Sequence, residues 1–366
     1  MESLGLVQKS FWEGRKVILT GHTGFKGSWF LTWLTELKAE VLGISLPPNE
    51  NVQIFHNIFE NVHKRITHVN CDIRERKKLE KLIDDFQPEI IFHFAAQPLV
   101  RRSYKIPYET WETNLMGTIN LLNSLKKIKK KCAVVIITTD KVYKNKEWKY
   151  SYRENDELGG YDPYSASKAA VEIAVHSWKN SFYKVSYENQ DPKFIATARA
   201  GNVIGGGDWS EDRIIPDAMR ALFNNEKITI RNPSSSRPWQ HVLEPLFGYL
   251  VLAENLFQHG KYTKGYNFGP EVASNKTVIN LVEKIVEKWP HGGGWVVEKK
   301  LDSLHEASLL NLSIEKVYKE LGWRPIWDYD KTIETTVSWY YDFYLGKKAY
   351  ELCLRDINNY SLDRNL

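Results

Sequence analysis

The chain has 366 residues, 42% of them hydrophobic and 26% charged, which is typical of a folded globular protein and excludes a disordered one. Fifty basic and 45 acidic residues leave a charge of +5, and the densest basic stretch, 126–131, is expected to be a solvated helix face, so no nucleic-acid partner is indicated. No apolar run reaches the ~18 residues that a membrane span needs. Residues 1–10 lack a signal-peptide pattern and three scattered cysteines exclude a disulfide framework, so we expect a cytoplasmic protein.

The first half of the chain is predicted to alternate strands with helices. Nearly continuous apolar runs predict buried strands, and helical periodicity fills several of the intervals between them. Such an order predicts a parallel sheet covered on both faces, a Rossmann-type doubly wound α/β fold. Strands are expected at 16–20, 40–46, 66–73, 89–96, 133–139 and 194–200, and helices at 27–38, 77–86, 107–127 and 163–181.

The pattern changes after about residue 205. A glycine-rich loop at 205–209, a Pro- and Ser-rich break at 232–236 and a glycine run at 292–294 separate short elements. We therefore expect one domain over 11–205 and a smaller lobe formed mostly by 206–350. Two short candidate strands in the second part, 227–231 and 265–268, are left open to joining the sheet of the first.

A glycine-rich turn joins the first predicted strand to the first predicted helix. Gly21, Gly24 and Gly27 allow a tight turn and close approach of a ligand to the backbone, and a helix N-terminus attracts a pyrophosphate. In this context the motif predicts a dinucleotide site, with an ordinary strand-to-helix turn as the alternative. Ser45 stands where an acidic residue usually ends the second strand, and no Arg is there, which slightly favours NAD over NADP. Asp72 is expected either to reach the adenine or to cap the next helix.

Two further motifs place reactive side chains near that turn. Tyr164 and Lys168 are four residues apart and so share one face of a predicted helix. A nearby ammonium lowers a phenol pKa and makes the phenolate a general base, although this spacing alone is more often a surface pair. Thr139, Asp140 and Lys141 follow the fifth strand, at the edge where doubly wound sheets bind ligands; a surface turn is the alternative.

In combination these motifs resemble the extended short-chain dehydrogenase/reductase family, and within it the nucleotide-sugar 4,6-dehydratases. The shared pieces are T-G-x-x-G-F-x-G at 20–27, H-F-A-A-Q at 93–97, T-N-x-x-G-T at 113–118, T-D-K at 139–141, Y-S-A-S-K at 164–168 and R-x-x-N at 199–202. The branch that acts on CDP-hexoses is favoured by G-H-T-G-F-K-G-S-W at 21–29, R-E-N at 153–155, G-G-Y-D-P-Y at 159–164, G-G-G-D-W at 205–209 and R-P-W-Q-H-V at 237–242. The resemblance covers roughly residues 11–345.

The resemblance implies an enzyme that removes water from a CDP-sugar with NAD as cofactor. Tyr164, beside Lys168, is implied to take the proton of the C4 hydroxyl, which Thr139 positions. Asp140 is implied to protonate the departing C6 hydroxyl. The dTDP-glucose branch carries a Glu as C5 base where Lys141 stands here, so Lys141 is either a neutral base or a group that holds water or stabilises the enolate.

The binding residues follow from the same resemblance. The 11–205 domain is implied to hold NAD through Gly21, Thr23, Gly24, Phe25, Lys26, Gly27, Asp72, Ile73, Ala95, Ala96, Gln97, Asn114, Tyr164 and Lys168. Asn202 and Arg237 match positions near the sugar and diphosphate in related enzymes. Further substrate candidates are Arg213 and Arg231, since guanidinium groups bind a diphosphate, and Tyr266, which could line the nucleotide or sugar pocket. A solvent-facing position is the alternative for Asn114, a surface position for each Arg, and a core position for Tyr266.

Other functions stay open at this stage. Another nucleotide-sugar 4,6-dehydratase would use the same residues on a different nucleotide. A nucleotide-sugar 4-epimerase or decarboxylase would use the Tyr and Lys pair without an acid such as Asp140. A non-catalytic dinucleotide sensor would need neither the Tyr and Lys pair nor the acid. His56, His63 and His68 lack metal-ligand spacing, so no metal is expected. Relatives pair through two helices, and the apolar faces of 107–127 and 163–181 predict a homodimer or homotetramer.

Overall fold

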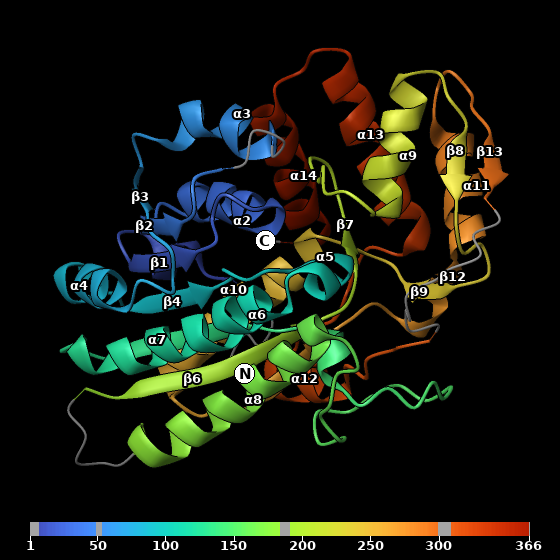
Figure 1. Cartoon of the computed structure of the whole chain (residues 1–366). Helices are drawn as coiled ribbons and strands as arrows, with labels where there is room; N and C mark the ends of the chain where they lie inside the picture. Colours follow the sequence, from blue (N-terminus) through green and yellow to red (C-terminus); the bar gives the residue numbers. More distant parts are fainter. Residues whose placement is uncertain (1–6, 49–52, 184–190, 299–308, 366) are drawn as a thin grey trace.

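The computed structural model describes residues 7–48, 53–183, 191–298 and 309–365. A parallel sheet lies at the centre of this described chain (Figure 1). Its strands are β1 (Lys16–Thr20), β2 (Glu40–Ser45), β3 (Ile66–Asn70), β4 (Ile90–His93), β5 (Cys132–Ile137), β6 (Lys193–Ala200) and β11 (Gly265–Phe268). They lie in the order β11-β6-β5-β4-β1-β2-β3, and each neighbouring pair is parallel. The predicted doubly wound sheet is confirmed, although some strands end a few residues earlier than expected.

The strand order reverses between β1 and β4, which creates a crevice at the carboxyl edge of the sheet. From β1 the chain continues to β2 on one side, and β4 pairs with β1 on the other, with Thr20 opposite His93. Ligands of doubly wound sheets bind at such a reversal. The glycine-rich turn follows β1 and residues 94–97 follow β4, so both lie at this crevice.

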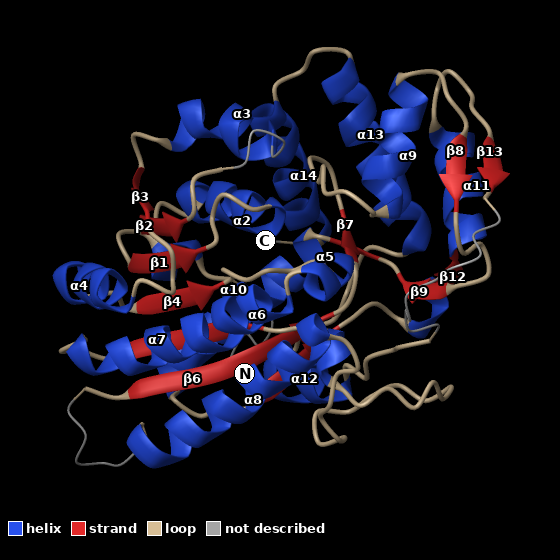
Figure 2. Cartoon of the chain, in the orientation of Figure 1, coloured by secondary structure: helices blue, strands red, loops and turns tan. Residues whose placement is uncertain are grey.

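Helices cover both faces of the sheet (Figure 2). On one face α4 (Arg76–Phe86), α7 (Gly117–Ser124) and α8 (Pro163–Phe182) contribute side chains to a core with Ile18 and Val134. On the other face α2 (Phe25–Glu36) and α10 (Leu243–His259) share a core with Val17 and Phe92, and α14 (Ala349–Asp363) packs on α2 and α3 (Gln53–Val62). Each fully buried apolar side chain of this kind contributes about 1.5–3 kcal/mol.

The helix predicted at 107–127 is interrupted. It consists of α6 (Pro107–Trp111), a π-helical turn η1 (Glu112–Met116), α7 and a 3-10 turn η2 (Leu125–Lys127). A π turn rotates the side chains within it relative to an α-helix, and such turns are frequent at functional sites. Here Asn114 is buried within η1. Gly117 follows because a Cβ there would come 2.4 Å from Ile73 Cδ1.

The elements after residue 205 divide between the sheet and a separate lobe. The strand expected at 265–268 joins the sheet as β11, whereas the one expected at 227–231 is β8 (Ile228–Ile230), which pairs with β13 (Trp295–Val297). Two further small pairs are β7 (Val203–Ile204) with β10 (Gln240–His241), and β9 (Ser236–Pro238) with β12 (Asn275–Thr277). The remaining helices are α1 (Lys9–Trp12), α5 (Val100–Lys105), α9 (Ile214–Phe223), α11 (Val278–Lys288), α12 (Glu315–Leu321) and α13 (Tyr329–Tyr344), with 3-10 turns η3 (Asp140–Val142) and η4 (Val272–Ser274).

Residues 49–52 and 184–190 of the first predicted domain, and 299–308 of the predicted lobe, lie outside the described residues. Within the described ranges, none of the helices combines the length and the apolar character that crossing a bilayer requires.

Candidate active site

The glycine-rich turn has a backbone that only glycine accommodates. Gly21 has a φ of +74°, and a Cβ on it would lie 2.7 Å from the backbone nitrogen of Ala95. A Cβ on Gly27 would lie 2.1 Å from the carbonyl oxygen of Gly21. Gly24 is the N-cap of α2 and has no side chain to bond the first N–H groups of the helix. The turn is therefore a compact cradle that points a helix N-terminus at the crevice, and it fits the pyrophosphate of a dinucleotide.

Thr23 connects the turn to the end of β2. Its hydroxyl lies 2.7 Å from Ser45 Oγ, and both side chains are buried. His22 is also buried, and its Nε2 lies 2.6 Å from His68 Nδ1. Burial, followed by the charge of His68, lowers the pKa of His22 to about 3, so its ring is neutral. Gly43 leaves room for that ring, because a Cβ there would come 2.7 Å from it.

Asp72 is neither free nor a helix cap. Its carboxylate accepts hydrogen bonds from Arg74, at 2.8 Å from the backbone nitrogen and at 2.7 Å from Nη2. The N-cap of α4 is Glu75, which makes no side-chain cap bond, so the capping alternative for Asp72 is wrong. Ile73 is buried beside Gly117. A ligand at this end of β3 would meet the paired Asp72 and Arg74 side chains.

Asn114 ties the loop after β4 to α8. Its Oδ1 accepts from the Gln97 backbone nitrogen at 2.8 Å, and its Nδ2 donates to Ser167 Oγ at 2.9 Å. Asn114 is only 1% exposed, so the solvent-facing alternative is wrong. Beside it the Ala95 backbone nitrogen donates to Thr20 Oγ1 at 3.2 Å, and Ala96 is half-buried in the same loop. These bonds fix the loop that borders the crevice.

The start of α8 presents Tyr164 and Lys168 on one face. Asp162 caps the helix by accepting from the Ser165 backbone nitrogen at 3.0 Å, and Pro163 occupies the first helical position. Tyr164 follows in the first turn at 8% exposure. One turn later the buried Lys168 donates from Nζ to the Ile137 carbonyl oxygen, the last residue of β5, at 3.0 Å.

Residues 139–142, which follow β5 after Thr138, contain Asp140; we call them the β5 turn. Thr139 is the N-cap of η3, and its hydroxyl donates to Asp140 Oδ1 at 2.8 Å. Asp140 is 2% exposed, and a Cβ on Gly201 would come 3.1 Å from its Oδ2. Lys141 Nζ lies 3.8 Å from Asp140 Oδ1. The absence of a side chain at Gly201 thus leaves room for the carboxylate.

Electrostatic coupling brings these groups together with two more cations. Burial raises the pKa of Tyr164 to about 12, a hydrogen bond with Thr139 and the charge of Arg213 lower it, and Asp140 raises it. Burial lowers the pKa of Lys168 to about 8. Burial also lowers the pKa of Lys26 to about 8, with Arg213 and Lys168 acting in the same direction and Asp140 opposing them.

The sequence predicts that Lys168 lowers the pKa of the Tyr164 phenol. In the structure burial is the largest influence on that pKa, and Lys168 Nζ donates to the Ile137 carbonyl oxygen. Lys26, a predicted cofactor residue, is also coupled electrostatically to Asp140. The site is a cluster of cations around one carboxylate and one phenol, a setting that attracts an anionic ligand.

The candidate substrate residues divide by position. Arg213 stands at the N-cap of α9, donates to Asp208 Oδ2 at 2.8 Å and acts electrostatically on Tyr164, so it belongs to the site. Asn202 is half-buried and follows Gly201, which lies beside Asp140. Both positions suit a substrate that spans from the β5 turn toward the lobe.

The other three candidates are held by neighbours. Arg231 donates to Asp212 at 2.5 Å and to Asp217 at 3.2 Å. Arg237 donates to the Ser236 carbonyl oxygen at 3.0 Å. Tyr266 is fully buried on β11 and donates to Glu320 Oε2 at 2.5 Å, so it has no surface to offer a sugar and the core alternative describes it.

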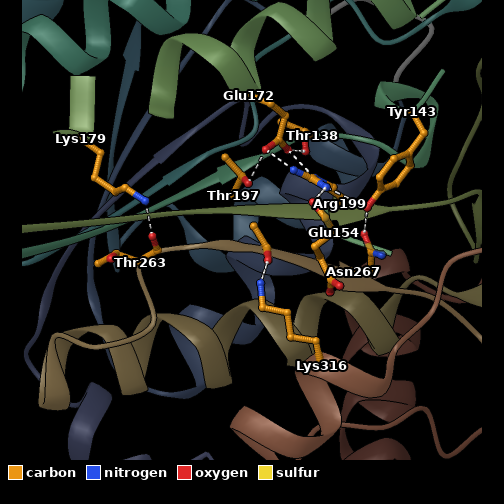
Figure 3. Close-up of polar contacts among 11 residues, drawn as sticks. Thr138, Tyr143, Glu154, Glu172, Lys179, Thr197, Arg199, Thr263, Asn267 and Lys316 are labelled. Atoms are coloured by element: carbon orange, nitrogen blue, oxygen red, sulfur yellow. Dashed lines mark hydrogen bonds and ion pairs between the residues drawn. The ribbon is translucent and has the colours of Figure 1, made fainter. Parts of the chain in front are cut away.

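Sequence reasoning missed Glu172. It lies on α8 one turn after Lys168 and is 6% exposed, and it forms a two-point ion pair with Arg199 in a buried polar network (Figure 3). The available signal was its spacing: Tyr164, Lys168 and Glu172 follow one another at four-residue intervals on one helix face.

A profile of the family described as GDP-mannose 4,6 dehydratase matches residues 18–336. The chain belongs to this family. It is 45% identical over 356 residues to the CDP-glucose 4,6-dehydratase of Salmonella typhimurium, which covers 97% of this chain and 98% of that protein. It is 24% identical to the dTDP-glucose 4,6-dehydratase of the same organism, over 89% of this chain and 92% of that one. The family resemblance seen in the motifs is confirmed.

Solved structures agree on the fold of the family. The dTDP-glucose 4,6-dehydratase DesIV of Streptomyces venezuelae, solved with NAD and TYD bound, superposes with a TM-score of 0.76 at 23% identity, covering 89% of this chain and 97% of that chain. The UDP-glucose-4-epimerase of Stenotrophomonas maltophila, solved with NAD and formylated UDP-arabinopyranose, gives 0.77 at 19% identity, covering 91% and 100%. One scaffold thus serves both dehydratases and epimerases, and the reaction must be argued from the site.

Proposed function

We propose that this family member converts CDP-D-glucose to CDP-4-keto-6-deoxy-D-glucose and water, with NAD as its cofactor. One observation carries the proposal: Thr139, Asp140 and Lys141 follow β5 beside Tyr164 and Lys168 of α8, at the carboxyl edge of the sheet where the glycine-rich turn also lies. The 45% identity over nearly the full length of a CDP-glucose 4,6-dehydratase supports both the reaction and the nucleotide.

The cofactor is assigned to the crevice at the strand reversal. The cradle formed by Gly21, Gly24 and Gly27 would hold its pyrophosphate, and Thr23 and Asp72 border the ends of β2 and β3 where its adenosine half would lie. When bound, NAD⁺ supplies the acceptor for the C4 hydride, the donor that returns it to C6, and a positive charge at the nicotinamide ring. The chain itself has no side chain that performs hydride transfer.

Tyr164 is proposed as the base for the C4 hydroxyl. As the phenolate, with Thr139 within hydrogen-bonding reach, it accepts the hydroxyl proton as C4 becomes a ketone. With burial as the largest cause, the Tyr164 pKa is raised to about 12 even though the Arg213 charge lowers it. The proposal therefore requires the other nearby cations, Lys168 and Lys26, to favour the phenolate when the site is filled. Ketone formation at C4 then acidifies the proton at C5.

Asp140 and Lys141 are proposed to complete the loss of water. Lys141, as the amine, takes the C5 proton, and Asp140, as the carboxylic acid, donates a proton to the C6 hydroxyl, so that the C6–O bond breaks and water departs. Lys141 then returns a proton to C5, which completes the 6-deoxy sugar. The Thr139 hydroxyl, bonded to Asp140 Oδ1 at 2.8 Å, fixes the orientation of the carboxyl group. Lys141 Nζ is 3.8 Å from the same oxygen, so the two groups can serve adjacent carbons.

The substrate diphosphate is assigned to the cationic side of the site. Arg213 is the leading candidate because it acts on Tyr164 and keeps donors beyond the one bonded to Asp208. Arg231 and Arg237 donate to Asp212 and to the Ser236 carbonyl oxygen, and they would bind the nucleotide after releasing these partners. The lobe of 206–350 is accordingly proposed to bind substrate and 11–205 to bind NAD, with α10 and β11 returning to the sheet.

The test is turnover by the purified protein. CDP-glucose, UDP-glucose, GDP-mannose and dTDP-glucose are incubated separately, with and without added NAD⁺, and the products are analysed by mass spectrometry. We expect loss of one water from CDP-glucose and little from the others. Inversion at C4 without water loss would favour the epimerase alternative, and water loss from another sugar nucleotide would move the assignment within the family. A protein that retains NAD⁺ but converts none of them would support the non-catalytic sensor.

A homodimer or homotetramer is also proposed, with this chain in the cytoplasm and in a route to surface polysaccharides. Tyr108 on α6, Met116 on η1 and Ile173 on α8 are 75%, 49% and 62% exposed, and a second copy presenting the same helices would cover them. We expect Ile173→Glu to lower the mass measured by analytical ultracentrifugation, whereas a monomeric parent protein would contradict the proposal.

The proposed place in the cytoplasm is supported by the cysteines. All three are buried and free, which suits a reducing compartment.

A further inference from the structure

The β5 turn is held on both sides by one buried polar network. Thr138 immediately precedes the turn and Tyr143 immediately follows it, and both side chains belong to the network of Figure 3. At its centre the Glu172 carboxylate accepts four hydrogen bonds. The donors are Thr138 Oγ1 at 2.6 Å, Thr197 Oγ1 at 2.7 Å, Arg199 Nη2 at 2.8 Å and Arg199 Nε at 3.0 Å.

Arg199 carries the network across to the far side of the turn. Its Nη1 donates to Tyr143 Oη at 2.8 Å and to the Glu154 carbonyl oxygen at 3.1 Å. Tyr143 in turn donates to Asn267 Oδ1 at 2.7 Å. Glu172, Arg199, Tyr143 and Asn267 are at most 6% exposed, so water does not compete for these bonds.

The helix that carries Tyr164, α8, is therefore hydrogen-bonded at the end of β5 to two consecutive residues, Ile137 and Thr138. Lys168 bonds the Ile137 carbonyl, and Glu172 bonds the Thr138 hydroxyl. Because Tyr164, Lys168 and Glu172 lie along one face of α8, the two bonds set the distance between the phenol and the β5 turn. Catalysis is sensitive to displacements of about 1 Å between reacting groups.

The network also supplies a negative charge beside Lys168. Glu172 opposes the effect of burial on the pKa of Lys168. The other charged or titratable neighbours are Lys26 from α2 and His93 from β4, each of whose pKa values is lowered in part by the Lys168 charge. Arg199 on β6 pairs with Glu172 itself. Glu172 is thus the one carboxylate in the described structure that acts on the pKa of Lys168.

We propose that Glu172 is a positioning residue for the dehydration, which holds the β5 turn in register with Tyr164 through Thr138 and Arg199 and places its carboxylate on the Lys168 face of α8. The proposal rests on the proposed function. It assigns Glu172 no contact with substrate or cofactor. It predicts that the chemical step, and not substrate binding, depends on this network.

Variants of two matched threonines distinguish a positioning role of the Glu172 network in catalysis from a contribution to stability alone. Thr138 and Thr197 both donate to Glu172, both are buried and both lie at sheet strands, but only Thr138 adjoins the β5 turn. Thr138→Val is expected to lower kcat by about 10-fold or more with KM for CDP-glucose unchanged. Thr197→Val is expected to keep kcat within about twofold, while both variants lower Tm by a similar few degrees.

The effect of the Glu172 charge on Lys168 is tested with Glu172→Gln, and Tyr143→Phe is the comparison that keeps this charge. Loss of the carboxylate favours neutral Lys168, so the alkaline limb of the kcat–pH profile should move to lower pH in Glu172→Gln. Tyr143→Phe breaks the link from Arg199 to the turn but leaves the charge, so its kcat should fall without movement of that limb. Should Glu172→Gln not fold because Arg199 is left unpaired, the threonine pair and Tyr143→Phe still decide the positioning.

Each outcome bears on the inference. Equal kcat losses in Thr138→Val and Thr197→Val, or an unmoved alkaline limb in folded Glu172→Gln, would overturn it while leaving the proposed function intact. A rise in KM without a change in kcat in Thr138→Val would also overturn it, because the network would then serve binding. If the parent protein removes no water from CDP-glucose, the proposed function fails first and the inference with it.

Discussion

At the scale of single residues, the proposed function makes Asp140 the group that distinguishes a dehydratase from an epimerase. We expect Asp140→Asn to lower the rate of water loss from CDP-glucose by about 100-fold or more, because the amide keeps the shape and the bond from Thr139 but has no proton of suitable acidity to donate. Mass spectrometry of the product measures the loss. Asp356→Asn is the matched control, since Asp356 is an equally buried carboxyl on α14, away from the crevice, and should leave the rate unchanged. A comparable loss in both variants would remove Asp140 from the mechanism.

Lys141 gives a second prediction at this scale. A base must lose its proton, and a guanidinium does not do so in proteins. We therefore expect Lys141→Arg to be as slow as Lys141→Met in exchanging the C5 proton of substrate with deuterium from the solvent, followed by NMR. Substantial exchange in Lys141→Arg but not in Lys141→Met would instead assign Lys141 to charge stabilisation of the enolate.

The residues also show where sequence reasoning reaches its limit. Tyr164, Lys168, Thr139 and Asp140 could be predicted because their motifs occur together with the glycine-rich turn in an order that resembles a known family, whereas the spacing of each motif alone favours a surface position. Glu172 contacts them only indirectly, through hydrogen bonds from Thr138 after β5 and Thr197 on β6. Nothing in the linear sequence shows which strands α8 will cover. Whether a Tyr such as Tyr266 faces a pocket or the core is likewise decided by tertiary packing.

At the scale of elements, the glycine-rich turn is specified by close backbone contacts. In Gly27→Ala the new Cβ would lie 2.1 Å from the Gly21 carbonyl oxygen, so the backbone of the turn must move. Overpacking of this kind costs about 1–3 kcal/mol. We expect lower thermal stability and loss of NAD⁺ retained through gel filtration. In Gly294→Ala the nearest side-chain atom would be 3.8 Å away, so this variant should behave as the parent protein; retention of NAD⁺ in Gly27→Ala would contradict the assigned cradle.

Elements with a strong local signal were the ones that the sequence predicted well. The buried strands and the helix at 163–181 have continuous apolar or capped patterns that are read within a few residues. The interruption of 107–127 by the π turn η1 has no such local cause. It follows from Asn114 reaching Gln97 and Ser167 at once, a requirement set by two distant segments.

At the scale of the whole molecule, the second half of the chain was the harder part to predict. The elements α10 and β11 complete the first core, and α14 packs on α2 and α3. Glu244 on α10 accepts from Tyr360 and Arg364 near the end of the described chain, at 2.6 Å and 3.1 Å. Such long-range pairs are invisible to periodicity, so a boundary near 205 describes the sequence pattern better than it describes the core.

Three buried neutral histidines make the stability of the whole molecule depend on pH. Burial lowers the pKa values of His22, His93 and His241 to about 3, whereas an unfolded chain titrates them near 6.5. Below about pH 6.5 the unfolded state therefore binds protons that the folded state does not, and the free energy of unfolding falls by up to about 1.4 kcal/mol per pH unit for each His. Burial raises the pKa values of Glu254 to about 7 and Asp356 to about 6, which opposes this trend.

The expected dependence of Tm on pH follows from the directions of these pKa shifts. The two acids hold extra protons in the folded state only above their unfolded pKa values, so their opposition fades below about pH 4.5 while the three histidines continue to act. We therefore expect Tm to fall from about pH 6 downward and most steeply below about pH 4.5. His241→Phe removes one of the three groups and should flatten the dependence of Tm on pH, whatever its effect on absolute stability. The exposed His259→Gln should leave the slope unchanged. Parallel curves for the parent protein and His241→Phe would show that buried histidine protonation does not drive acid unfolding.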